Sequence, residues 1–322
     1  MDVSVIIPTY NRLWCLPQAI ASCRNSTCQT EIIVVDDGST DGTWDWLQTQ
    51  PDLVILRQEN WGKPWAANRG FEHAKGKYVR FLDSDDWLCE GAIDRQFQQA
   101  EAATADVVVA GYEAYAEPGT LLHTSPWVEC DDFIAQQLGE CSSSHYSAYL
   151  FRREFIAAIP HRPDFAQRDD RLFVLEVAMA HPKVAVDDHP AFCHRHHQHV
   201  RLQAAQGLDS VATHWQHLRL YRKCLAKLEQ MGELTPRRGR AAAKILWHLA
   251  HWIAYTHPEE GAAVAHWVYE LDQTFQPPER GVLGHLYRRL GFRYTERILQ
   301  WRRELLAGLR LSLPRSLKPS SV

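Results

Sequence analysis

The sequence predicts an α/β protein with a doubly wound, mostly parallel sheet, followed by an all-helical carboxyl-terminal region. Short β-branched runs alternate with helix-like segments over roughly the first hundred residues, which is the pattern of a doubly wound domain. Each run stops at a turn-forming polar cluster, as expected of strands buried on both faces. Beyond residue 200, apolar residues recur at spacings of three and four, which predicts amphipathic helices.

Predicted strands and helices alternate along the amino-terminal part. The strands are expected at Val3–Ile7, Glu31–Val35, Leu53–Leu56, Lys77–Leu82 and Asp106–Ala110. The helices are expected at Leu16–Cys23, directly after Asp41-Gly42, at Pro64–Ala74 and at Ala92–Ala100. Strand, helix and strand in succession form right-handed crossovers and so build a parallel sheet. In such a sheet, ligands bind at the carboxyl ends of the strands.

The carboxyl-terminal region is expected to be helical throughout. One amphipathic face is formed by Leu208, Val211, Trp215, Leu218, Tyr221, Leu225 and Leu228. Further helices are expected at Ile245–Tyr255, Ala262–Leu271 and Thr295–Leu309. The chain should therefore comprise an α/β domain at residues 1–200, divided near residue 110, and a helical region at residues 201–322.

Composition and charge exclude several classes of protein. The chain has 322 residues, a formal net charge of -4 and a pI near 6.5, which argues against a nucleic-acid partner. The first predicted strand begins at Val3, almost at once after Met1, and no stretch reaches the roughly 20 apolar residues of a membrane span, so we expect a cytoplasmic protein. The eight cysteines include no CxxC pair, which favours reduced thiols over a zinc ribbon.

Three polar loops follow predicted strands, at residues 8–12, 36–39 and 83–86. The first two loops combine an aromatic ring, amide and hydroxyl donors and a carboxylate, which suits stacking and hydrogen bonding to a nucleotide base. Residues 37–41 can also be a simple turn and helix cap. Asp83 and Asp85 are closely spaced carboxylates, and hard divalent cations take such oxygen ligands. Acidic pairs of this kind also occur as solvated turns.

Four blocks of sequence join these loops to their strands. They are Val5-Ile6-Ile7-Pro8-Thr9-Tyr10-Asn11, Ile33-Val34-Val35-Asp36-Asp37-Gly38-Ser39-Thr40-Asp41, Asn60-Trp61-Gly62-Lys63-Pro64 with Ala67-Asn68-Arg69-Gly70, and Gly76-Lys77-Tyr78-Val79-Arg80-Phe81-Leu82-Asp83-Ser84-Asp85-Asp86. In this order and spacing the chain resembles the inverting glycosyltransferase family 2, which has the GT-A fold. The resemblance is close over residues 1 to about 110 and looser from there to about 200.

The resemblance implies an enzyme that moves a sugar, with inversion, from a nucleotide-diphosphate donor to a hydroxyl of a glycan or lipid-linked acceptor. UDP is the donor nucleotide that the family favours, and cell-surface polysaccharide biosynthesis, such as that of lipopolysaccharide, is its usual pathway. Residues 1–110 would form the nucleotide-sugar half of the catalytic domain and residues 111–200 the acceptor half.

The resemblance also implies roles for particular residues. The nucleotide-sugar contacts would be Pro8, Thr9, Tyr10, Asn11, Arg12, Asp37, Lys63, Asn68, Asp83, Ser84 and Arg195. The cofactor would be Mn²⁺ or Mg²⁺, and its ligands would be Asp85, Asp83 and His197.

Inversion in one displacement needs a general base for the acceptor hydroxyl. The family places this base in an acidic pair at the start of a helix, and Asp169-Asp170 precedes the helical run Val174–Ala180. The resemblance therefore implies Asp170 as the base, with Asp169 as the second candidate. The flanking Arg168 and Arg171 also allow a helix cap held in surface ion pairs.

The segment Cys193–Arg201 contains four histidines within six residues. Its Arg195 and His197 match the Tyr-Arg-x-His block of the family, which lies near the donor diphosphate. The alternatives are a run of solvated or packed histidines and a structural zinc site, although no CxxC or HxxxH pair accompanies the segment.

The end of the chain is strongly basic. From Arg280 onward there are ten basic and two acidic residues, a net charge of +8, with Leu, Ile, Trp and Tyr between them. A basic amphipathic helix of this kind can lie on the anionic inner surface of the cell membrane. The alternative is a helical cap whose apolar side packs on the α/β domain.

Other functions are compared with the transferase by their motifs. A sugar-phosphate nucleotidyltransferase needs a Gly-rich loop after the first strand, where this chain has Pro8–Asn11, and a dehydrogenase needs GxGxxG. A non-catalytic relative that binds a nucleotide sugar or a glycan is the remaining alternative. Asp83, Asp85 and Asp170 favour the enzyme, because a binding protein has no need of costly clustered carboxylates.

Overall fold

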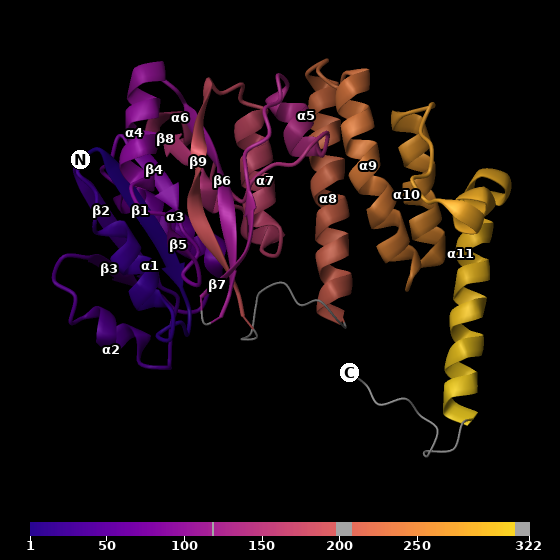
Figure 1. Cartoon of the computed structure of the whole chain (residues 1–322), viewed down its shortest axis with the longest axis horizontal. Helices are drawn as coiled ribbons and strands as arrows, with labels where there is room; N and C mark the ends of the chain where they lie inside the picture. The colour runs from indigo at the N-terminus through magenta and orange to yellow at the C-terminus, as the bar shows by residue number, and fades with distance from the viewer. Residues whose placement is uncertain (118, 198–207, 313–322) are drawn as a thin grey trace. The chain divides into compact units, whose positions relative to one another are not determined.

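The computed structural model describes residues 1–117, 119–197 and 208–312 (Figure 1). The chain forms two compact units: unit 1 comprises Met1–Gln137 and Cys141–Gln203, and unit 2 comprises Leu138–Glu140 and Ala204–Val322. Some residues of the predicted histidine-rich segment and basic tail, among them His199, Arg201, Arg315 and Lys318, lie outside the described residues.

Unit 1 is built on a sheet of nine strands in its described part. These are β1 (Val3–Thr9), β2 (Thr30–Asp36), β3 (Val54–Arg57), β4 (Tyr78–Phe81), β5 (Trp87–Leu88), β6 (Val107–Ala116), β7 (Thr120–Ser125), β8 (Leu150–Arg152) and β9 (Val184–His196). The strand order is β3-β2-β1-β4-β8-β6-β9-β5, with β7 paired to β6. Strands β3, β2, β1 and β4 are parallel, as predicted, whereas β8 runs antiparallel to both of its neighbours. The α/β fold is confirmed, and its sheet is mixed.

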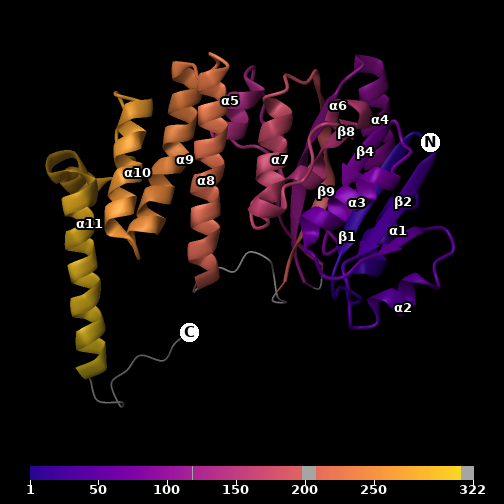
Figure 2. The ribbon, with the colours of Figure 1, turned by 180° about the vertical axis from the view of Figure 1, so that it is seen from behind.

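Helices cover this sheet. They are α1 (Leu16–Cys23), α2 (Thr43–Leu47), α3 (Lys63–His73), α4 (Ala92–Ala103), α5 (Phe133–Leu138), α6 (Arg153–Ile156) and α7 (Asp169–Ala178), with short 3₁₀ turns at Tyr146–Ala148 and Pro163–Phe165. Helix α3 packs against β1 and β2, where it can be followed from behind (Figure 2). A Cβ on Gly70 would lie 2.4 Å from Ile6 Cγ2, so this glycine permits the close packing of helix on strand.

The long strand β9 escaped prediction from the sequence. Its centre, Asp187-Asp188-His189-Pro190, interrupts the β-branched pattern that marks the other buried strands. The strand nevertheless pairs in parallel with β6 on both sides of a register shift between Ala110 and Tyr112. It thereby carries residues 193–197, the described part of the histidine-rich segment, to the edge of the sheet where the predicted loops lie.

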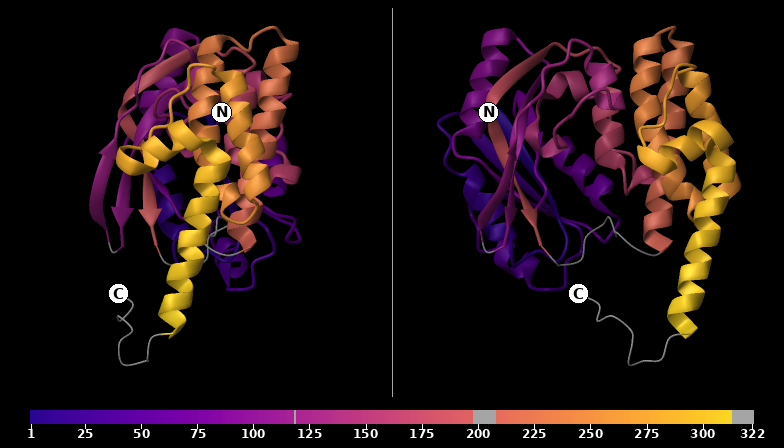
Figure 3. Two further views of the ribbon diagram at one scale, coloured as in Figure 1. Left: turned by 90° about the vertical axis from the view of Figure 1, so that its right-hand side faces the viewer. Right: turned by 45° about the vertical axis from the view of Figure 1, so that its right-hand side comes forward.

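Unit 2 is helical, as the sequence predicts. Its helices are α8 (Leu208–Gln230), α9 (Pro236–Ala254), α10 (Pro258–Leu271) and α11 (Gly281–Ser312). Helix α9 packs against α8 and α10 (Figure 3), and Trp247 of α9 is fully buried. Gly291 has φ +75°, which interrupts α11 near its start. No helix within the described residues combines the length and the apolar character needed to cross a membrane.

Candidate functional site

The loops after β1 and β2 are tied together by Asn11. This residue has φ +52°, a left-handed conformation that asparagine tolerates better than most side chains. Its backbone N–H donates to Ser39 Oγ at 2.8 Å, and its Oδ1 accepts from the backbone N–H of Thr40 at 2.8 Å. The side chain of Asn11 therefore shapes the two loops and holds them at one edge of the sheet.

Asp37 links these loops to the start of α3. Its buried carboxylate accepts hydrogen bonds from Gln58 Nε2 at 2.7 Å and from the backbone N–H groups of Trp61 at 3.0 Å and Gly62 at 2.9 Å. A carboxylate offers about four acceptor positions, and these donors occupy three of them. The contacts to residues 61 and 62 also fix the point at which Lys63 begins the helix.

Two groups of the first loop are suited to a nucleoside. Thr9 Oγ1 is buried and has no hydrogen-bond partner among the described residues. A buried polar atom of this kind costs free energy unless a ligand or water satisfies it. Tyr10, the next residue in the chain, is 42% exposed, and an exposed aromatic ring can stack on a base.

Three carboxylates gather directly after β4. The oxygens of Asp83, Asp85 and Asp86 include a set that lie within 4.8 Å of one another. Asp85 Oδ2 lies 3.1 Å from His197 Nε2 and 3.9 Å from Arg12 Nε. Burial alone would raise the pKa of Asp85, but the hydrogen bond from His197 and the charge of Arg12 lower it below its usual value. Burial raises the pKa of Asp86 to about 6.

Lys63 supplies positive charge to this acidic group. Its Nζ forms an ion pair with Asp83 Oδ1 and lies 5.2 Å from the centre of the Tyr146 ring. Burial would lower the pKa of Lys63, yet the neighbouring carboxylates, Asp83 above all, raise it well above its usual value. The amine therefore stays charged and can meet an anionic ligand.

The acidic group fits a hard divalent cation. Mn²⁺ and Mg²⁺ prefer carboxylate oxygens, and this group offers oxygens from three aspartates in a small space. His197 bonds to Asp85 and could orient that ligand or join it. A second group, Cys89, Glu113 and Cys193, offers two sulfur atoms and so suits softer metals.

The acidic pair at the start of α7 has two different environments. Asp169 is buried; its Oδ2 lies 2.5 Å from His161 Nδ1, and its Oδ1 accepts from the backbone N–H of Arg162. Asp170 is half-buried, and its charge contributes to the raised pKa of Lys63. Asp170 therefore acts electrostatically on Lys63, whereas Asp169 holds the segment before the helix.

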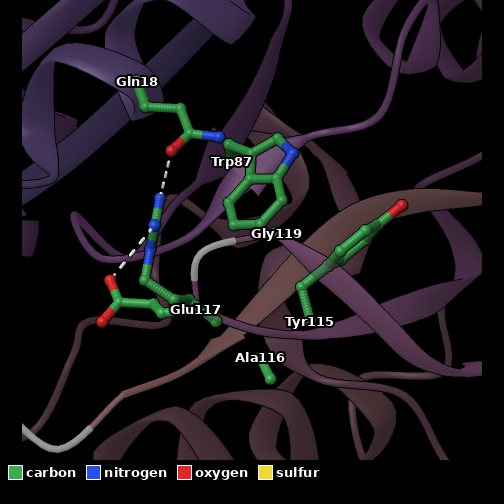
Figure 4. Close-up of a pocket in the computed structure, with 7 residues that line it drawn as sticks. Gln18, Trp87, Tyr115, Ala116, Glu117 and Gly119 are labelled. Atoms are coloured by element: carbon green, nitrogen blue, oxygen red, sulfur yellow. Dashed lines mark hydrogen bonds and ion pairs between the residues drawn. The ribbon is translucent and has the colours of Figure 1, made fainter.

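Arg195 is held between aromatic rings. Its guanidinium carbon lies 4.7 Å from the centre of the Trp87 ring and 5.6 Å from that of Trp14. Its Nε donates to the backbone oxygen of Asp85 at 2.8 Å, and its Nη atoms contact Gln18 and Glu117. A cavity of about 260 Å³ lies beside it, lined by Gln18, Trp87, Tyr115, Ala116, Glu117, Gly119 and Arg195 (Figure 4).

Two residues predicted to contact the nucleotide sugar, Asn68 and Ser84, form hydrogen bonds within the protein. The Asn68 side chain exchanges hydrogen bonds with the backbone of His161, at 2.9 and 2.8 Å. Ser84 is buried, and its backbone oxygen accepts from Cys15 Sγ at 3.3 Å. Asp86, Tyr146 and the two tryptophans beside Arg195 were not predicted as site residues. Of these four residues, only Asp86 could have been found from the sequence, because it ends the block Gly76–Asp86 that carries the family resemblance.

Comparison with known proteins identifies the amino-terminal domain. Residues 4–159 match the family model described as glycosyl transferase family 2. Glycosyltransferase GlyG of Streptococcus pneumoniae is 37% identical over 142 residues, which cover 42% of this chain and 46% of the relative. The putative teichuronic acid biosynthesis glycosyltransferase TuaG of Bacillus subtilis is 33% identical over 149 residues, which cover 43% of this chain and 59% of the relative. These matches span roughly half the length of the two relatives.

Solved structures share the fold. TarS 1-349 of S. aureus in complex with UDP-GlcNAc has a TM-score of 0.63 at 16% identity, covering 95% of this chain and 92% of that one. The mannosyltransferase PcManGT of Pyrobaculum calidifontis, in complex with GDP-Man and Mn²⁺, has a TM-score of 0.51 at 17% identity, covering 93% and 87% of the two chains. The fold is the GT-A fold with helices after it, and within it residues 4–159 match the model of glycosyl transferase family 2.

Proposed function

We propose that the protein is an inverting glycosyltransferase that moves a sugar from a nucleotide-diphosphate donor to a hydroxyl of a glycan or lipid-linked acceptor. The single observation that carries this proposal is the grouping of three aspartates, of which Asp83 pairs with Lys63, a lysine on which the charge of Asp170 also acts. A leaving diphosphate needs positive charge, and an attacking hydroxyl needs a base. This group of side chains can serve both needs.

The donor nucleotide is proposed to lie along the loops after β1 and β2. Tyr10 would stack on the base, while the remaining acceptor position of Asp37 and the unpartnered Thr9 hydroxyl would bond to the nucleoside. Asn11 and Arg12 keep these loops and Asp85 in place. We propose a uridine nucleotide, which the family favours, and TarS in its complex with UDP-GlcNAc gives an example on this fold.

The diphosphate is proposed to lie between Lys63 and the acidic group. Asp83 and Asp85 would hold Mn²⁺ or Mg²⁺, with His197 orienting Asp85, and the metal would neutralise the charge of the leaving diphosphate. Lys63 would exchange its contact with Asp83 for a phosphate oxygen. Asp170 would accept the proton of the acceptor hydroxyl as that oxygen attacks the sugar.

The proposed acceptor belongs to bacterial surface polysaccharide biosynthesis, such as that of lipopolysaccharide. The names of two relatives support this: TuaG, given above, and a Campylobacter jejuni GalNAc(5)-diNAcBac-PP-undecaprenol beta-1,3-glucosyltransferase, 38% identical over 112 residues that cover 33% of this chain and 36% of the relative. A lipid-linked acceptor would place the protein in the cytoplasm at the inner face of the cell membrane.

Turnover of the donor tests the proposal. Purified protein is incubated with UDP-sugars, Mn²⁺ and a panel of glycan acceptors, and released UDP is measured for the wild type and for Asp170→Asn. We expect metal-dependent release that the variant reduces by about two orders of magnitude or more, while UDP affinity stays within about twofold of the wild type. Binding of UDP-sugar without any turnover, across a panel of acceptors, would favour the non-catalytic alternative.

A further inference from the structure

Helix α11 presents a stripe of apolar side chains to solvent. Tyr294, Ile298, Trp301 and Leu305 recur at spacings of four, three and four residues, which places them on one face of the helix. All four are exposed, Tyr294 by 62% and Trp301 by 64%. Large exposed apolar side chains that share one helix face mark an interaction surface more often than isolated ones do.

The opposite face of the same helix is used for packing within unit 2. Phe292, Thr295 and Glu296 are buried. Glu296 Oε1 accepts from Tyr287 Oη at 2.6 Å and lies 2.7 Å from His251 Nδ1 of α9. One face of α11 therefore anchors the helix in unit 2, and the apolar stripe lies on the other face.

Arginines border the stripe. Arg293 and Arg297 precede its first two members, and both contact Glu259, at 2.7 and 3.1 Å. Arg302 is exposed and follows Trp301. From Arg280 to the end of the chain the net charge is +8, against -4 for the chain as a whole. Positive charge is therefore concentrated in the region that carries the stripe.

We propose that this face of α11 docks on an anionic phospholipid surface. Tyr and Trp rings are suited to the boundary between headgroups and acyl chains, Ile and Leu to the acyl side, and arginines to lipid phosphates. A second copy of the chain fits less well, because a symmetric contact would bring two strongly basic helices together. The inference rests on unit 2 alone and does not require that the protein transfer sugars.

Vesicle flotation of the full-length protein tests this proposal. Vesicles of phosphatidylcholine with phosphatidylglycerol are compared with vesicles of phosphatidylcholine alone. We expect binding to the anionic vesicles, weakened by high salt because the Debye length falls to about 3 Å at 1 M. The double variant Ile298→Ser/Trp301→Ser should bind at least about tenfold more weakly, because it removes two large side chains from the buried face.

The control is Leu121→Ser/Leu122→Ser, which replaces two exposed apolar side chains of β7 in unit 1 and should leave vesicle binding unchanged. Circular dichroism and UDP binding establish that both double variants remain folded. Equal binding to neutral and anionic vesicles, or equal binding by the wild type and the α11 variant, would overturn the proposal. A third result would also overturn it: the wild type binds no vesicles but forms a dimer in sedimentation velocity, and the α11 variant does not form that dimer. The stripe would then be a protein interface.

Discussion

At the scale of single residues, Asp169 and Asp170 are neighbours with different tasks. Asp169 is buried against His161 and the backbone of Arg162, so its charge is already satisfied within the protein. Asp170 is half-buried and acts electrostatically on Lys63. The two carboxylates therefore have different surroundings, and in the proposed mechanism only Asp170 acts on the substrate.

Substitution of each aspartate separates these tasks. Asp170→Asn should lower the rate of sugar transfer by about 10²- to 10⁴-fold, since an amide cannot take the hydroxyl proton, and should leave the melting temperature nearly unchanged. Asp169→Asn should lower the free energy of unfolding by about 1–3 kcal/mol, because it leaves buried donors imperfectly paired. Thermal unfolding and steady-state rates measure both effects. A stable Asp169→Asn protein with the larger loss of rate would reverse the assignment.

Lys63 provides a second prediction at this scale. Lys63→Gln should weaken binding of a nucleoside diphosphate by about tenfold or more, because a charge-assisted hydrogen bond to phosphate is lost. The matched control Lys75→Gln changes an exposed lysine after the same helix and should bind as the wild type does. Since the pKa of Lys63 is well above its usual value, the amine should keep its proton between about pH 7 and pH 9. Loss of its charge should therefore not weaken binding in that range, from about pH 7 to pH 9. Calorimetry measures the affinities, and equal losses in the two variants would contradict this role.

At the scale of elements, the contact between α3 and β1 positions Lys63. A Cβ on Gly70 would lie 2.4 Å from Ile6 Cγ2 and 3.3 Å from Val35 Cγ2, both in strands of the sheet. Gly70→Ala should therefore reduce the free energy of unfolding by about 1–3 kcal/mol, although alanine has the better helix propensity. Urea unfolding measures the change. A variant as stable as the wild type would show that the helix can move away from the strand without cost.

The anchor of α11 predicts a dependence on pH. Burial alone would raise the pKa of Glu296, but hydrogen bonds from His251 and Tyr287 lower it below its usual value of 4.5. A carboxylate with a lowered pKa stabilises the fold above that usual value, and its contribution is lost as the pH falls through the folded-state pKa. Glu296→Gln should cost about 1–3 kcal/mol at neutral pH and should flatten the loss of stability in acid. If the free energy of unfolding fell equally with decreasing pH in the wild type and in the variant, this account would be contradicted.

The sequence predicted the first half of the sheet better than the second. Strands β1 to β4 are short runs rich in apolar residues and followed by polar loops, so both their positions and the edge that carries Asp37 and Asp85 follow from local pattern. Strand β9 has Pro190 and a pair of aspartates within it, and β5 has only two residues. Their places depend on pairing with distant strands, which local sequence does not encode.

The same limit applies to the site. The acidic pair at residues 169 and 170 was found from the sequence, but the difference in burial between its members was not. The contact of Arg195 with the rings of Trp14 and Trp87 joins three residues from distant parts of the chain. Only the folded chain brings them together.

At the scale of the whole molecule, the two units provide different surfaces. Unit 1 contains most of the segment that matches the glycosyl transferase family 2 model, and it carries the acidic group with Lys63. Unit 2 carries the exposed stripe of α11 and the excess of positive charge. Donor binding and lipid binding are therefore expected to be separable by substitution, with the α11 variant retaining its affinity for UDP.

The most direct test of the central claim is calorimetric binding of UDP, with and without Mn²⁺, to the wild type and to Asp85→Ala. Asp86→Asn serves as a companion variant, because it lies in the same loop and keeps the shape of the side chain. The account predicts UDP binding that depends on Mn²⁺ and falls by about two orders of magnitude in Asp85→Ala, as expected when a metal ligand is removed. Failure of the wild type to bind UDP, GDP or dTDP under any metal condition would contradict the assignment of this group of aspartates to a nucleotide-sugar site.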